Sequence, residues 1–171
     1  MRIDLMEVLS GRMQADLAVV NGRIVDVWSG RVLSGGIAVK GGRIVRVGDI
    51  SQMVGPGTRV LDARNQFVTP GLIEPHAHAY HANMNMTEYA RTLLLRGTTA
   101  VTEASYFAGQ MAGLQGVRFF IDELKRTPLT VLFQSPALGY LQNLELGLPG
   151  RPGGLTGPEL LETLDWEGNV G

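Results

Sequence analysis

The chain has three histidines, His76, His78 and His81, and all of them fall within six residues. His76 and His78 are two positions apart, and every second side chain of a β-strand lies on the same face. Two imidazoles side by side at the end of a strand form half of a metal site. The alternative is a chance His-Ala-His tripeptide whose rings are solvated in a loop, and only the surrounding sequence can decide between the two.

Composition narrows the chemistry of such a site. The chain has 171 residues and no cysteine, which excludes a disulfide framework and a thiolate metal site. A metal would be held by imidazole and carboxylate, ligands that suit zinc, iron or manganese. The net charge is −1 with scattered basic residues, so no nucleic-acid surface is expected. No apolar run approaches the length of a membrane span, so none is expected. Asp4 and Glu7 argue against a secretory signal, and we expect a cytoplasmic protein.

Short β-runs broken by glycine fill the region before the histidines, after an amphipathic helix within residues 1–14. Residues 18–27 and 38–47 agree at seven of ten positions. Asn21-Gly22 divides the first segment and Gly41-Gly42 divides the second, and such dipeptides are typical of two-residue hairpin turns. The sequence therefore predicts one hairpin used twice, in a small antiparallel β-domain with a structural role.

Alternating strands and helices are predicted from the histidine stretch onward. The apolar residues Phe67, Val68, Leu72 and Ile73 indicate a buried strand that ends at the histidines. The elements expected after it are a helix over 85–97, a strand over 98–102, a helix over 116–126, a strand over 129–133, a Gly/Pro loop over 139–157 and a helix over 159–164. This order is typical of a parallel α/β fold. We expect two domains, 1–66 and 67–171.

The last residues, 169–171, lie where a fourth strand would begin. A parallel sheet needs partners on both edges and cover on both faces. We therefore expect the chain to be an N-terminal fragment of a longer protein.

Residues 16–30 and 68–78 resemble the metal-dependent amidohydrolase superfamily, in which a His-x-His motif closes the first barrel strand. Within it the chain is most similar to adenine deaminases, on the residues Val27–Gly30, Glu88–Ala90, Gly97–Thr99 and Ser135–Ala137. The resemblance implies an α/β fold: the first three βα units of a (β/α)8 TIM barrel, preceded by a small antiparallel β-sandwich domain.

The resemblance also implies a function. His76 and His78 would bind a divalent metal, zinc, iron or manganese, in a centre that is binuclear in the complete protein. The reaction would be hydrolysis of a cyclic C–N bond, as in conversion of adenine and water to hypoxanthine and ammonia. The substrate would be a purine or a small cyclic amide, and the full-length form could be a homo-oligomer. The general base and the remaining ligands would lie beyond Gly171.

Two departures from the adenine deaminase pattern leave alternatives open. The family continues after His-x-His with Glu-Ser-Ser, where this chain has residues 80–82, and places Asp-Pro-His-Glu after strand two, where this chain has residues 104–107. The alternatives are a dihydroorotase-like or imidazolonepropionase-like cyclic amidohydrolase, or an inactive truncated fragment.

Several polar or aromatic residues at the same strand ends have two interpretations each. Glu103 is either a substitute carboxylate near the substrate or a solvated strand-end residue. His81 is either a third ligand or substrate contact, or an exposed loop histidine. Tyr80, Tyr106 and Gln134 are expected to pack at the rim, with pocket lining as the alternative.

Overall fold

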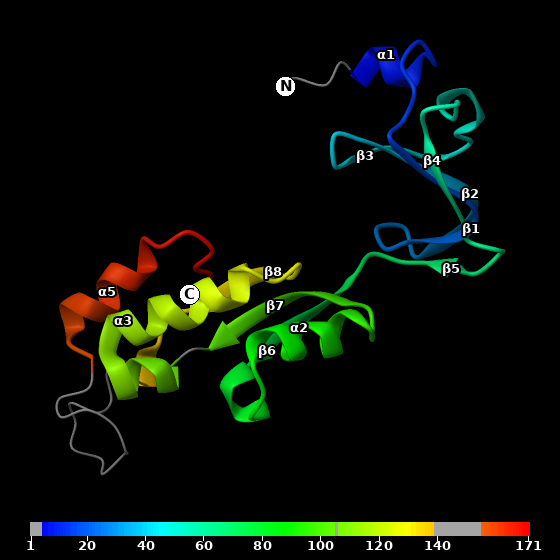
Figure 1. The fold of residues 1–171 in the computed structure, drawn as a ribbon. Coiled ribbons are helices and arrows are strands. Elements are labelled where there is room, and N and C mark those ends of the chain that lie inside the picture. The colour runs from blue at the N-terminus through cyan, green and yellow to red at the C-terminus, as the bar shows by residue number, and fades with distance from the viewer. Residues whose placement is uncertain (1–4, 105, 139–154) are drawn as a thin grey trace. The chain divides into compact units, whose positions relative to one another are not determined.

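The computed structural model describes residues 5–104, 106–138 and 155–171 (Figure 1). The chain divides into two compact units, Met1–Pro70 and Gly71–Gly171. Each unit has its own sheet, so the fold is a mixture of helices and strands, and the predicted α/β class is confirmed at this level. Among the described residues, no helix is both long and apolar enough to cross a membrane.

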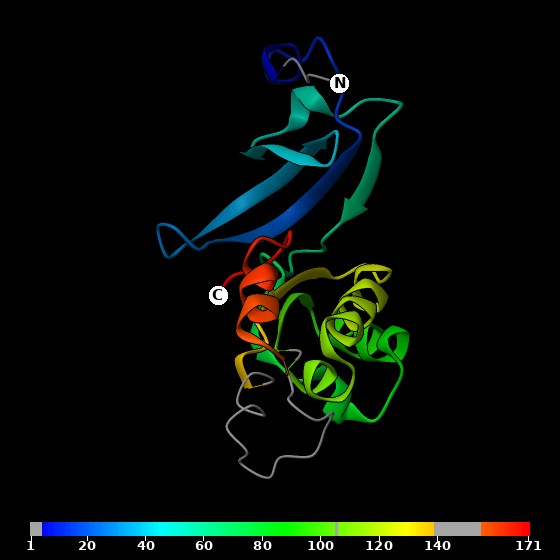
Figure 2. The ribbon, with the colours of Figure 1, turned by 90° about the vertical axis from the view of Figure 1, so that its left-hand side faces the viewer.

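The first unit is a five-stranded sheet with a short helix at its start. Its strand order is β3-β2-β1-β4, and β5 also pairs with β1. Figure 2 shows the long β1–β2 hairpin of this unit. The elements are α1 (Leu5–Leu9), β1 (Leu17–Asp26), β2 (Arg31–Lys40), β3 (Arg43–Gly48), η1 (Ser51–Met53), β4 (Arg59–Asp62) and β5 (Phe67–Val68). The strands β4 and β5 run parallel to β1, so the sheet is mixed and the wholly antiparallel prediction is wrong.

The two predicted hairpins have different outcomes. Gly41 and Gly42 form the turn between β2 and β3, with φ of 54° and 74°, as predicted. Asn21-Gly22 forms no turn, because β1 runs through it and only its register with β2 shifts there. Asn21 adopts a positive φ of 55° inside this irregularity, and its side chain donates a hydrogen bond to Asp62. The chain reverses instead after Asp26, whose carboxylate accepts the backbone N–H of Trp28.

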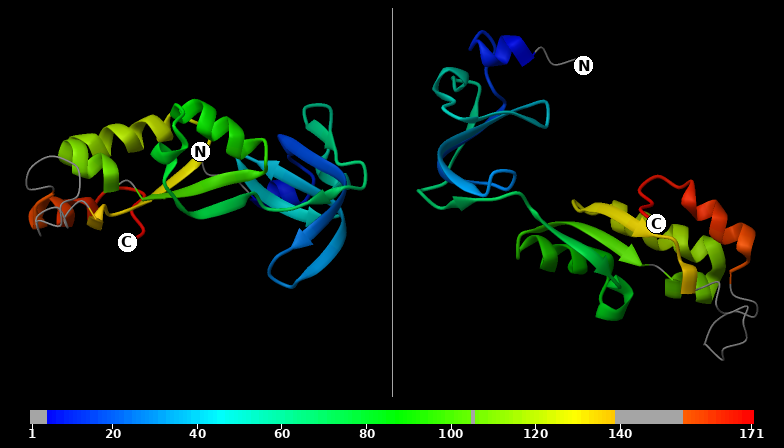
Figure 3. Two further views of the ribbon diagram at one scale, coloured as in Figure 1. Left: turned by 90° about the horizontal axis from the view of Figure 1, so that it is seen from below. Right: turned by 180° about the vertical axis from the view of Figure 1, so that it is seen from behind.

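The second unit is a three-stranded parallel sheet in the order β6-β7-β8, as the alternating pattern predicts. The helices α2 and α3 lie along one face of this sheet (Figure 3, left). Its elements are β6 (Leu72–Ala77), η2 (Ala79–Ala82), α2 (Met86–Leu94), β7 (Thr98–Ala104), α3 (Tyr106–Lys125), β8 (Thr130–Gln134) and α5 (Gly157–Leu164). A single parallel bridge joins Phe133 to Asn169, next to β8.

Capping residues mark where the helices α2 and α5 begin. Asn85 accepts the backbone N–H of Glu88 and begins α2, as its spacing predicts. Thr156 and Glu159 form a capping box at the start of α5. The helix α3 begins ten residues earlier than the predicted 116, and Gly113, with φ of 64°, interrupts it. Residues 139–154 of the predicted Gly/Pro loop lie outside the described residues.

The cores of the two units are separate. The first contains Val8, Ala18, Ala38, Ile50 and Met53. The second lies between the parallel sheet and its helices, and contains Ala77, Ala90, Val101, Leu124, Leu129 and Val131. The prediction that the start of the histidine strand is buried is wrong, since Leu72 and Ile73 are 58% and 65% exposed. Their strand, β6, is an edge strand whose partner among the described residues is β7.

Candidate metal centre

The end of β6 positions the His76 and His78 side chains. Between them, Ala77 is buried in the core with Val101 and Leu124. Because neighbouring side chains of a strand lie on opposite faces, burial of Ala77 places the His76 imidazole on the face opposite the helices. His78 directly follows the strand, and its ring centroid lies 4.8 Å from that of His76. The backbone N–H of His76 donates to the Glu74 carboxylate at 3.1 Å, which fixes the backbone at this point.

Each imidazole has its Nδ1 atom next to a carbonyl oxygen. His76 Nδ1 lies 2.9 Å from Oε1 of Gln134 at the end of β8. His78 Nδ1 lies 3.1 Å from the backbone oxygen of Ala104 at the end of β7. A carbonyl oxygen can only accept a hydrogen bond, so Nδ1 carries the hydrogen in both rings. In a neutral imidazole the other nitrogen, Nε2, then has a free lone pair.

The two Nε2 atoms face one another at 3.1 Å. In these tautomers both Nε2 lone pairs are free, so neither ring donates to the other, and a cation between them would satisfy both. Two nitrogens about 2.05 Å from a zinc ion and separated by this distance would subtend about 100° at the metal, close to the tetrahedral angle. The donor type, tautomer and spacing of this pair therefore fit a divalent metal.

The pair supplies only part of a coordination sphere. Among the described residues, no group of three or more histidine, aspartate and glutamate side chains is arranged to hold a metal ion. Catalytic zinc sites usually have three protein ligands. His76 is exposed and His78 half-buried, so neither side chain is fully enclosed by the described residues.

His81, Tyr80 and Tyr106 surround the His78 ring. The ring centroids of His81 and Tyr106 lie 5.5 Å and 5.3 Å from that of His78. Tyr80 stacks on Phe107, with ring centroids 5.1 Å apart. Burial and the hydrogen bond to Tyr106 raise the pKa of Tyr80 above its ordinary value, so its hydroxyl is neutral. These aromatic side chains support one side of the histidine pair.

Glu103 is fully buried. The interpretation of Glu103 as a solvated residue at the end of a strand is therefore wrong. Glu103 lies two residues after Val101 and therefore points toward the helices, away from the histidine pair. Its Oε2 accepts the backbone N–H of Ala79 at 2.9 Å, directly after His78, and its Oε1 has no hydrogen-bond partner. Glu103 thus contacts the backbone of the histidine segment rather than the imidazoles.

Burial gives Glu103 a pH-dependent effect on stability. Desolvation raises its pKa from 4.5 to about 7, although the Ala79 N–H opposes the shift. Between these values the folded chain binds more protons than the unfolded chain, so the free energy of unfolding falls as pH rises from about 4.5 to about 7 and then levels. The full loss is about 3 kcal/mol.

Glu103→Gln removes this titration, and urea unfolding of the metal-free chain at pH 5 and pH 8 measures the difference. We expect the parent to lose more stability than the variant between the two pH values. Equal losses in the two proteins would contradict the assignment of this pH dependence to Glu103.

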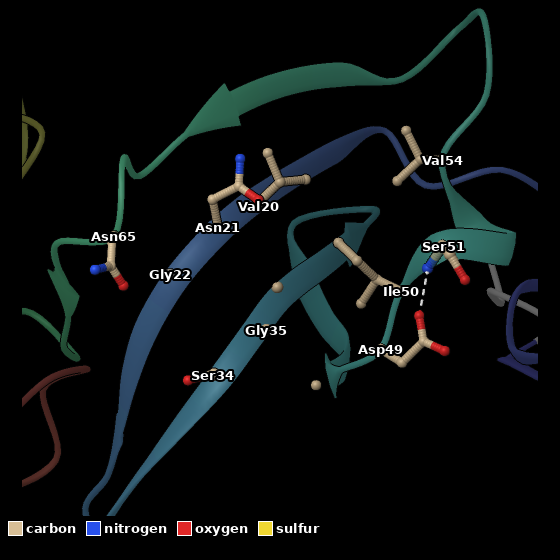
Figure 4. Close-up of a pocket in the computed structure, with 12 residues that line it drawn as sticks. Val20, Asn21, Gly22, Ser34, Gly35, Asp49, Ile50, Ser51, Val54 and Asn65 are labelled. Carbon is tan, nitrogen blue, oxygen red and sulfur yellow. Dashed lines mark hydrogen bonds between the residues drawn. The ribbon is translucent and has the colours of Figure 1, made fainter.

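A hollow of about 800 Å³ lies in the first unit, on residues that include Gly22, Gly35, Asp49, Ser51 and Asn65 (Figure 4). Asp49 turns its carboxylate to the backbone N–H of Ser51. The hollow has no histidine in its lining and no buried polar side-chain atom that lacks a partner. The histidine pair remains the stronger candidate site.

Two contacts of the pair were not expected from the sequence. Gln134 was predicted to pack at the rim, and its contact with His76 joins residues 58 positions apart. The order of the predicted strands was the one signal that could have placed it near the histidines. The Ala104 acceptor is a backbone oxygen, which no residue type reveals.

The sequence is similar to curated adenine deaminases. It is 36% identical over 134 residues to that of Moorella thermoacetica, a match that covers 78% of this chain and 22% of the relative. It is 34% identical over 179 residues to that of Mesorhizobium japonicum, which covers all of this chain and 28% of the relative. The predicted resemblance to adenine deaminases is confirmed, and the chain spans about a quarter of the length of these relatives.

Solved structures show a similar fold. The L-hydantoinase (dihydropyrimidinase) of Arthrobacter aurescens matches with a TM-score of 0.59 at 18% identity, over 87% of this chain and 37% of that one. This likeness concerns the fold alone. No protein-family model matches the chain.

Proposed function

We propose that this adenine deaminase-like chain carries the first metal-ligand pair of a metal-dependent amidohydrolase, which hydrolyses a C–N bond of a ring such as adenine. The observation that carries the proposal is the pair of Nε2 atoms of His76 and His78, 3.1 Å apart, whose tautomers both leave lone pairs free. The similarity to adenine deaminases supports the reaction class.

The architecture that we propose is a partial (β/α)8 barrel beside a β-sandwich domain. The parallel β6-β7-β8 sheet would be the first three barrel strands, and the mixed sheet of the first unit would be one layer of the sandwich. In such barrels the reacting groups lie at the carboxyl ends of the strands. His76, Ala104 and Gln134 lie at the ends of β6, β7 and β8, in agreement with that rule.

The residues of this chain would have distinct tasks. His76 and His78 would hold the metal through Nε2, and the contacts of their Nδ1 atoms keep each ring in place. A bound divalent metal supplies Lewis acidity that activates water for hydrolysis near neutral pH. Glu103 positions the turn after His78 through the Ala79 N–H. His81 and the neutral Tyr80 lie beside His78, where they would contact a substrate ring.

A chimeric enzyme tests the substrate. The chain is fused in place of the corresponding part of the Mesorhizobium japonicum adenine deaminase, which aligns with all of it. We expect the manganese- or zinc-loaded chimera to release ammonia from adenine, and the chimera with His76→Ala and His78→Ala to release none. A chimera that binds metal but hydrolyses only cyclic amides such as dihydroorotate would overturn adenine as the substrate. One that binds metal and hydrolyses neither would overturn the enzymatic function.

A further inference from the structure

Gln134 reaches the histidine pair from the far side of β7. It is the last residue of β8, and β7 separates β8 from the histidine strand. The β7 residue paired with Gln134 is Ala104, whose methyl group leaves room above the strand. The Gln134 side chain extends across β7, and its Oε1 lies 2.9 Å from His76 Nδ1.

This contact decides which nitrogen of His76 carries the hydrogen. The His76 ring has no other hydrogen bond among the described residues except its approach to His78. Without the Gln134 oxygen, nothing on the described chain would favour hydrogen on Nδ1. The Nε2–H tautomer would then be free to form, and its donation to His78 Nε2 would leave neither Nε2 atom available to a metal.

We propose that Gln134 is a positioning residue that prepares His76 for metal binding by accepting its Nδ1–H. The inference rests on the proposed function, because it presumes that the Nε2 pair binds a metal. Partners of this kind orient a ligating imidazole and raise its basicity. The Ala104 carbonyl does the same for His78, but a backbone atom cannot be removed by substitution, so Gln134 is the partner that can be tested.

Zinc affinity, measured in competition with a chromophoric chelator, distinguishes this role from simple rim packing. Gln134→Met keeps the length and volume of the side chain and removes the acceptor. We expect it to weaken zinc binding by about 10- to 100-fold. Gln134→Glu retains an acceptor and should bind zinc at least as tightly as the parent. Gln115→Met makes the same change at an exposed glutamine of α3 and should leave the affinity within about twofold.

Nitrogen-15 NMR of the metal-free protein at pH 8 reports the tautomer directly. His76 should carry hydrogen on Nδ1 in the parent and in Gln134→Glu, and should shift toward the Nε2–H form in Gln134→Met. The dispersion of the same spectra shows whether each variant is folded. Gln134→Ser, too short to reach His76, replaces Gln134→Met in the test if that variant does not fold.

The result that overturns the inference is a folded Gln134→Met whose tautomer and zinc affinity equal those of the parent, while His76→Ala loses zinc. If His76→Ala also binds zinc like the parent, the proposed metal site itself fails. The two failures are therefore distinguishable.

Discussion

Replacement of either His76 or His78 by alanine is expected to weaken zinc binding by more than about 100-fold. The two Nε2 atoms lie 3.1 Å apart, so one ion would bind both, and the loss of one ring would remove one of the two ligands identified among the described residues. The decrease in zinc affinity should be larger than that caused by substitution of Gln134, which contacts His76 but not the metal. A metal–nitrogen bond is removed in the first case and only weakened in the second. Competition with a chromophoric chelator measures the affinity of each variant.

His81→Ala is the matched control for these two substitutions. His81 lies in the same segment and is exposed, but its ring makes no hydrogen bond to the pair among the described residues. We expect its zinc affinity to stay within a few-fold of the parent. If His76→Ala, His78→Ala and His81→Ala all bind zinc like the parent, the metal-binding pair is wrong.

Phe133→Ala is expected to lower the free energy of unfolding by about 3–5 kcal/mol. Phe133 is fully buried in β8, in a cluster with Val117 and Ile121 of α3, and its ring centroid lies 6.0 Å from that of Trp166. Truncation removes the apolar contacts and leaves a cavity that close-packed neighbours fill only in part. Urea unfolding followed by circular dichroism measures the loss.

Phe119→Ala removes the same ring from an exposed position of α3, where the side chain is 69% exposed. This substitution should lower the free energy of unfolding by less than about 1 kcal/mol. Similar losses at the two positions would show that Phe133 is not a core residue.

Because Gln134 follows Phe133 in the same strand, the variant Phe133→Ala should also weaken zinc binding at temperatures where it is still folded.

The parallel part of the fold is predictable because its signals are local. The spacing of Asn85 and Glu88 predicts the start of α2, and the β-branched run after Gly97 predicts β7. Both signals depend on the backbone near the residues themselves. The Gly41-Gly42 turn is predictable for the same reason, since two consecutive positive φ angles favour glycine.

Asn21-Gly22 shows where local signals fail. The same dipeptide suits a turn and an irregular strand, because both use a positive φ at asparagine. In the structure β1 has partners on both sides, and Val68 of β5 approaches so closely that a Cβ atom on residue 22 would lie 3.0 Å from its side chain. Val68 is 46 positions away from Gly22 in the sequence, so the tertiary structure decides the outcome.

Part of the candidate site could not be predicted, again because it depends on tertiary structure. His76 and His78 are recognisable from their spacing, whereas Gln134 and the Ala104 carbonyl join the site only through the strand order. The sequence identifies Glu103 as a strand-end carboxylate, but the direction of its side chain depends on which face of β7 packs against the helices. Only the tertiary structure determines that face, which is the one that carries Val101.

Anomalous diffraction from crystals of the chain grown with zinc tests the central claim most directly. We predict one zinc ion about 2.0–2.1 Å from Nε2 of both His76 and His78, with His76 Nδ1 still donating to Gln134. A zinc ion bound through either Nδ1 atom, or crystals in which zinc binds only elsewhere on the chain, would contradict the proposed metal centre.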